Sequence, residues 1–79
     1  MPRIKILSGK DVVNILKGFN FYIISQKGSH IKLQRIHNGD KQTLTIPIHE
    51  ELDKGTTSAI YRQVLKYIAE GEIKKYFYQ

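Results

Sequence analysis

The sequence predicts an α+β fold in the order α-β-β-β-α, a two-layer sandwich with a short C-terminal helix. Apolar residues recur at helical spacing in two segments, one near each end of the chain. Between them lie three segments rich in β-branched and aromatic residues, and Asn38-Gly39 joins the last two. A three-stranded meander can bury one face under two helices, which leaves its other face free for solvent or for function.

The first helix is expected over residues 8–17. Ser8 is a suitable N-cap, and Asp11 then lies near the positive end of the helix dipole. Gly18 suits the left-handed position that ends many helices. The apolar residues at helical spacing are Val12, Val13, Ile15, Leu16 and Phe19.

The three strands are expected near residues 21–26, 30–37 and 42–48. Asn38-Gly39 is typical of a type I′ turn, which needs positive φ at both central positions. In the second strand the odd positions begin with Ile31 and Leu33, whereas the even positions begin with His30 and Lys32. Since successive strand side chains point to opposite faces, His30 is predicted to face solvent.

A second helix is expected from about residue 56, with Thr56 or Thr57 as its N-cap. Gly71 is predicted to break or bend it, and a short last helix is expected around residues 72–78. The predicted buried stripe consists of Ile60, Tyr61, Val64, Leu65 and Ile68.

The charge is unevenly distributed along the 79-residue chain. The net charge of +6 falls entirely on residues 1–41, and residues 42–79 sum to zero. Such a one-sided basic field favours a polyanionic partner such as nucleic acid, although a basic surface can also serve solubility alone. Because the chain has no cysteine, no long apolar run and no signal peptide, we expect a single cytoplasmic domain over residues 1–79 with no membrane partner.

His30 is the strongest candidate for chemistry. Imidazole can give and take protons near pH 7, and a neighbouring lysine (Lys27 or Lys32) can stabilise charge on a phosphate. Gly28 lets the backbone approach a phosphate, and Ser29 can donate a hydrogen bond to it. This combination suits RNA cleavage by attack of the 2′ hydroxyl on the adjacent phosphate, which needs no metal. The alternative is an ordinary surface histidine after a tight turn.

The other two histidines are weaker candidates. His49 is either a second acid/base group, an RNA contact or a solvated loop residue, and the loop is the favoured interpretation. His37 flanks the Asn38-Gly39 turn, where a structural or solvent-exposed role is expected. The spacing of the three histidines matches no metal-ligand motif, so we expect no metal or other cofactor.

Lys54-Gly55-Thr56 resembles the end of a phosphate-binding loop but lacks the complete motif. The N–H groups at the start of the helix that it opens would still favour an anion, and an ordinary helix cap explains the residues about as well.

The order of elements is similar to that of double-stranded-RNA-binding domains, and the motifs resemble those of the HicA (YcfA-like) toxins, a family of mRNA interferases. The resemblance spans about residues 7–68. The motifs that carry it are Ser8-Gly9-Lys10, Lys27-Gly28-Ser29-His30, Ile46-Pro47-Ile48-His49, Lys54-Gly55-Thr56 and Arg62-Gln63. Residues 69–79 depart from the family pattern, so their role and the oligomeric state stay open.

The resemblance implies a ribonuclease toxin of a type II toxin–antitoxin system that cleaves mRNA and arrests translation. It implies that His30 is catalytic and that a HicB-type antitoxin neutralises the protein by covering this residue. Gly28 and Ser29 would shape the site. Position and charge, more than the resemblance, lead us to expect that Lys27, Lys32 and Lys54 contact RNA. Two alternatives remain: a non-catalytic RNA-binding module of the same fold, and a protein-interaction domain that uses the aromatic residues 76–78.

Overall fold

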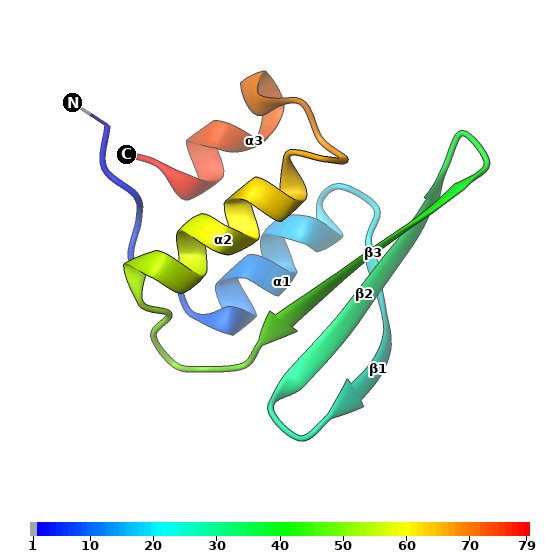
Figure 1. The fold of residues 1–79 in the computed structure, drawn as a ribbon, viewed down its shortest axis with the longest axis horizontal. Coiled ribbons are helices and arrows are strands. Elements are labelled where there is room, and N and C mark those ends of the chain that lie inside the picture. The colour runs from blue at the N-terminus through cyan, green and yellow to red at the C-terminus, as the bar shows by residue number, and fades with distance from the viewer. Residues whose placement is uncertain (1) are drawn as a thin grey trace.

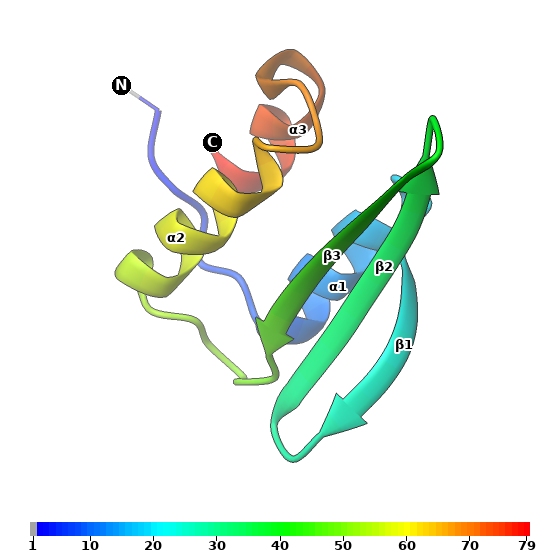
Figure 2. The same ribbon diagram turned by 45° about the vertical axis from the view of Figure 1, so that its right-hand side comes forward.

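The computed structural model describes residues 2–79 and confirms the predicted fold class. Its elements are α1 (Gly9–Lys17), β1 (Tyr22–Lys27), β2 (His30–His37), β3 (Asp40–Pro47), α2 (Lys54–Val64) and α3 (Glu70–Phe77). The strands form one antiparallel sheet in the order β1-β2-β3. The helices gather on one side of this sheet, with α1 behind β2 and β3 and with α3 farthest from the strands (Figures 1 and 2). No helix in this part of the chain has the length and apolar character needed to cross a membrane.

The first helix begins where the sequence predicts and ends differently. The Ser8 hydroxyl accepts a hydrogen bond from the Asp11 amide at 2.9 Å, and the Asp11 carboxylate accepts one from the Ser8 amide at 3.0 Å. This reciprocal capping satisfies two amides that have no partner inside the helix. The expectation of a left-handed Gly18 is wrong: Gly18 is right-handed with φ of −65°, and the chain reverses at Asn20 with φ of 73°. An asparagine tolerates this conformation better than most residues do.

The two hairpins fix the register of the sheet. Asn38 and Gly39 both have positive φ, as a type I′ turn requires, whereas in the first turn only Gly28 does. In the resulting register His30 lies opposite Lys27 on β1 and opposite Pro47 on β3. Ile31 and Leu33 are buried and His30 and Lys32 are exposed, which confirms the predicted alternation along β2.

The second helix begins earlier and is shorter than the sequence predicts. Its N-cap is Asp53, not Thr56 or Thr57, because the Asp53 carboxylate accepts the Thr56 amide at 2.7 Å. The Thr57 side chain is buried instead and donates to the backbone carbonyl of Asp53. The helix ends at Val64, so Gly71 neither breaks nor bends it but lies inside α3.

The C-terminal helix closes the hydrophobic core. Ile73 and Phe77 on α3 are fully buried. The Tyr61 hydroxyl on α2 donates to the Glu70 carboxylate at 2.8 Å, and burial together with this bond raises the pKa of Tyr61 to about 12. Backbone hydrogen bonds between Arg3 and Gln79, at 3.0 and 2.9 Å, hold the N-terminal segment against the C-terminus.

Arg35 is a structural residue, although it is one of the basic residues that give residues 1–41 their net positive charge. It projects from the core face of β2 and is only 8% exposed. Its guanidinium donates to the Gln42 side chain at 2.6 Å and to the backbone carbonyls of Phe19 and Tyr67 at 2.9 and 2.8 Å. It also lies 4.9 Å from the centre of the Phe21 ring. The side chain therefore ties the segments that follow α1 and α2 to the sheet.

We predict that Arg35→Lys lowers the free energy of unfolding by about 1–3 kcal/mol, because an ammonium group cannot reach the three acceptors that the planar guanidinium holds. Arg62→Lys is the matched control, since Arg62 is exposed, and should change stability by less than about 0.5 kcal/mol. Urea denaturation of both variants measures the difference. Equal midpoints would contradict a structural role for Arg35.

Candidate active site

Three segments that are distant in sequence meet at one end of the molecule. They are the turn between β1 and β2, the chain that follows β3, and the start of α1, and all lie in the lower part of Figure 1. The Ile48 amide donates to the Ser29 carbonyl at 2.6 Å, and the Gly9 amide donates to the His49 carbonyl at 2.9 Å. These two bonds place residues 47–49 between the β1–β2 turn and the first turn of α1.

Gly9 is the residue that permits this arrangement. A Cβ atom there would lie 2.0 Å from the Pro47 carbonyl oxygen and 2.9 Å from the Ile48 Cα atom. Both neighbours are backbone atoms that cannot rotate away. Only a residue without a side chain therefore lets α1 begin against the end of β3.

His30 is exposed at the first position of β2. Lys27 lies directly opposite it on β1, and directly opposite residues have Cβ atoms about 4.5–5.5 Å apart. Lys32 is exposed two positions further along β2 and shares the same sheet face. The position of a Cβ atom on Gly28 has no neighbour within 4 Å, so this side of the turn is open to a ligand.

The hairpin therefore brings together five of the six residues that the sequence singles out, and Lys54 is not among them. Lys54 is the first residue of α2 and follows a loop with three carboxylates, those of Glu50, Glu51 and Asp53. Hydrogen bonds from Thr56, first of all from its amide, lower the pKa of Asp53, so its carboxylate is charged at neutral pH. A negative N-cap already occupies the N-terminus of α2, which disfavours a phosphate there.

The structure adds Gly9, Lys10 and His49 to this end of the molecule. His49 is exposed in the loop after β3, which confirms the predicted loop. Together with Ser8, Lys10, Ile48 and Glu50 it lines a hollow of about 350 Å³. Gly9 and Lys10 belong to the Ser8-Gly9-Lys10 motif that the sequence shows. Only the fold shows that this motif lies beside His49. Among residues 2–79, no three histidine, cysteine or carboxylate side chains are grouped so that they could hold a metal ion.

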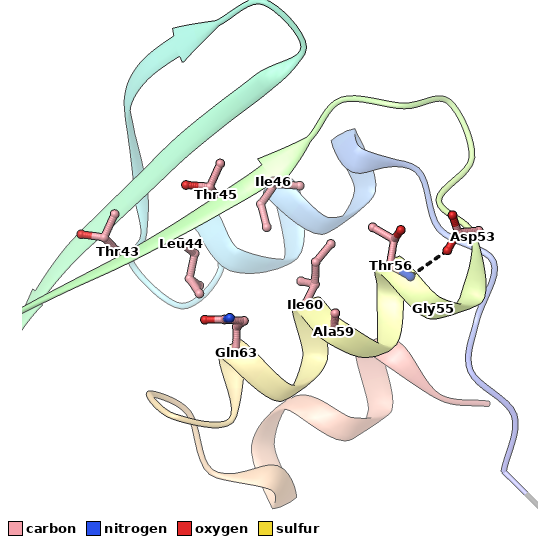
Figure 3. Close-up of a pocket in the computed structure, with 10 residues that line it drawn as sticks. All are labelled: Thr43, Leu44, Thr45, Ile46, Asp53, Gly55, Thr56, Ala59, Ile60 and Gln63. Atoms are coloured by element: carbon pink, nitrogen blue, oxygen red, sulfur yellow. Dashed lines mark hydrogen bonds between the residues drawn. The ribbon is translucent and has the colours of Figure 1, made fainter.

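A larger hollow, of about 660 Å³, lies between β3 and α2 (Figure 3). Leu44 and Ile46 from β3 and Ile60 from α2 point toward one another there, and the capping bond from Thr56 to Asp53 lies at one end. Its lining contains no histidine, lysine or arginine. The candidate catalytic residues therefore lie outside this hollow, on an open surface.

Comparison with known families gives a match over most of the chain. The family model described as the HicA toxin of bacterial toxin–antitoxin systems matches residues 9–65, which is well over half of the chain. The matched range begins at Gly9 and includes the β1–β2 turn, residues 47–49 and α2. No curated protein and no solved structure matches the chain.

We predict that Gly9→Ala lowers the free energy of unfolding by about 1–3 kcal/mol, since the added methyl group overlaps the Pro47 carbonyl and must push α1 away from β3. Gly71→Ala is the matched control, because a Cβ atom at that helical position meets nothing within 4 Å, and it should be neutral or slightly stabilising. Thermal and urea unfolding of the two variants compare them. A Gly9→Ala protein as stable as the Gly71→Ala protein would contradict the close approach.

Proposed function

Because the chain belongs to the HicA toxin family of bacterial toxin–antitoxin systems, we propose that it is a metal-independent endoribonuclease that cleaves mRNA with His30 as acid/base group. The observation that carries this proposal is the exposed imidazole of His30 at the start of β2, directly opposite Lys27. Imidazole is the side chain best suited to proton transfer near neutral pH.

The reaction that fits these groups is transfer within the RNA backbone. His30 removes the proton from a ribose 2′ hydroxyl, whose oxygen then attacks the adjacent phosphorus. The bond from phosphorus to the 5′ oxygen breaks as that oxygen takes up a proton, which leaves a 2′,3′-cyclic phosphate and a 5′ hydroxyl end. Neither water nor a metal ion is consumed in this step, and Lys27 and Lys32 supply positive charge near the phosphate.

The surface charge supports RNA as the substrate. Lys27 and Lys32 flank His30 on one exposed face, and Lys10 lies beside residues 48–50. Cationic side chains that contact phosphates release condensed counterions, which favours RNA and makes its binding weaken as salt rises. Arg35 does not contribute to this basic surface, because its buried guanidinium donates to the backbone carbonyls of Phe19 and Tyr67. Lys54 stays a candidate RNA contact at the edge of this surface, weakened by the neighbouring carboxylates.

The family implies an antitoxin as partner. We propose that this antitoxin is of the HicB type and that it inhibits by covering His30. The open position of His30 supports such a mode, because a shallow exposed site can be blocked by any surface that lies over it.

We predict that His30→Ala lowers the rate of RNA cleavage by about 10²–10⁴-fold, the usual contribution of a positioned acid/base group. The measurement uses labelled single-stranded RNA with excess chelator, in which the unmodified protein should stay active. His37→Ala is the control, because His37 is also exposed on β2 but lies at the opposite end of the strand, and it should cleave normally.

A folded His30→Ala protein that cuts as fast as the parent would overturn the assignment of His30. An unmodified protein that binds RNA and yields no products would favour the alternative of a non-catalytic RNA-binding module.

A further inference from the structure

We propose that His49 is the second acid/base group of this site, the general acid that protonates the 5′ oxygen as it leaves, while His30 acts as the base. This inference rests on the proposed ribonuclease function and names a group that the cleavage step requires. Transfer within the RNA backbone needs one proton removed from the 2′ oxygen and one delivered to the 5′ oxygen, on opposite sides of the phosphorus. A single imidazole must otherwise serve both positions in turn.

The fold places His49 close to His30. Pro47 is the residue directly opposite His30, and the Ile48 amide bonds to the Ser29 carbonyl at 2.6 Å, so the pairing of the two strands extends one residue past β3. His49 follows Ile48 directly and His30 follows Ser29 directly, so each histidine is one residue away from this hydrogen bond. Both side chains are exposed at this end of the molecule.

The position of His49 is fixed although its side chain is exposed. Its carbonyl accepts the Gly9 amide at 2.9 Å, and the preceding peptide lies against Gly9, where a side chain has no room. Two elements therefore hold this loop, α1 from one side and the β1–β2 turn from the other. A general acid must be positioned in advance, because every degree of freedom left to it lowers the rate of the transfer.

The surroundings of His49 suit a group that approaches a phosphate. It lines the 350 Å³ hollow with Lys10, whose charge can hold a non-bridging phosphate oxygen. The other charged groups around it are Glu50, which lines the same hollow, and Asp53, the N-cap of α2. The charge of His49 also contributes to the lowered pKa of Asp53, after the hydrogen bonds from Thr56, so the two groups are within electrostatic range.

The complete step is balanced with these two residues alone. The proton of the 2′ hydroxyl passes to His30, and the bond from the 2′ oxygen to phosphorus forms. The bond from phosphorus to the 5′ oxygen breaks as that oxygen takes a proton from His49. The two histidines end with exchanged protonation states, and proton exchange with water restores them.

The decisive experiment compares two synthetic RNA oligonucleotides with the same sequence. One has a normal scissile phosphate, and the other has sulfur in place of the bridging 5′ oxygen. A thiolate is a far better leaving group than an alkoxide and needs no proton to depart. We expect His49→Ala to slow cleavage of the normal RNA by about 10²–10⁴-fold with little change in KM, and to cleave the sulfur-containing RNA within tenfold of the parent. His30→Ala should be equally slow on both.

Two further measurements test whether His49 acts by donating a proton. His49→Gln keeps the size and polarity of the side chain but cannot donate an ionisable proton, so it should behave like His49→Ala. Loss of His49 should also remove the alkaline limb of the kcat profile against pH, because that limb reports the acid in the complex with RNA. His37→Ala should change neither rate nor profile, and circular dichroism establishes that each variant is folded.

Two outcomes would overturn the assignment. One is a folded His49→Ala protein that cleaves normal RNA within tenfold of the parent, and the other is a slow variant that sulfur does not rescue. In both cases the unmodified protein still cuts RNA and His30→Ala does not, so the proposed function stands. Failure of the unmodified protein to cut either RNA would instead overturn the proposed function and this inference together.

Discussion

The site depends on one close approach, that of the first turn of α1 to the end of β3. Because Gly9 has no side chain, the helix can begin against the Pro47 carbonyl, where a Cβ atom on residue 9 would lie only 2.0 Å from the carbonyl oxygen. The Gly9 amide then bonds to the His49 carbonyl, and the Ile48 amide bonds to Ser29. Because each of these bonds joins a different element, they convert three separate chain segments into one rigid corner. The start of α1 thus has a second role, because it holds the loop next to the β1–β2 turn in place.

The basic residues of the N-terminal half divide into two groups with different physical roles. Arg35 is buried, and its fork geometry matches one side-chain oxygen and two carbonyls from segments that are far apart in sequence. Lys10, Lys27 and Lys32 stay exposed around the corner that holds His30 and His49. An ammonium group on a flexible chain suits contacts with mobile phosphates, whereas a planar guanidinium suits fixed acceptors. The net charge therefore indicates a polyanionic partner only when Arg35, whose guanidinium is used inside the fold, is left out of the count.

The parts of the fold predicted best from the sequence depend on short-range patterns. The period of two along residues 30–37 and the Asn38-Gly39 turn predicted the bounds of β2 and the exposure of His30, whereas β3 runs from Asp40 to Pro47 and not over residues 42–48. Helix ends were predicted less well, because Asp53 and Thr56 are both good caps and the sequence does not show which amide each can reach. The role of Arg35 was not predictable, since its acceptors are backbone carbonyls brought together only by the complete fold. For the same reason, the position of His30 was predictable from its own hairpin. The contact between Gly9 and His49 was not, because it forms only when α1 packs against the end of β3.

An active site on an open corner has consequences for how the protein is regulated. The residues proposed to bear the chemistry lie on the surface rather than in the 660 Å³ hollow between β3 and α2. The hairpin that holds His30 is fixed by its register and by the Ser29 carbonyl. Within residues 2–79, no segment covers His30, whose side chain is exposed. If the proposed site is correct, a molecule that covers this corner and competes with RNA for the same surface would control its activity. Membership in a toxin–antitoxin family fits this proposal, because a toxin whose site is exposed needs a partner that occupies it.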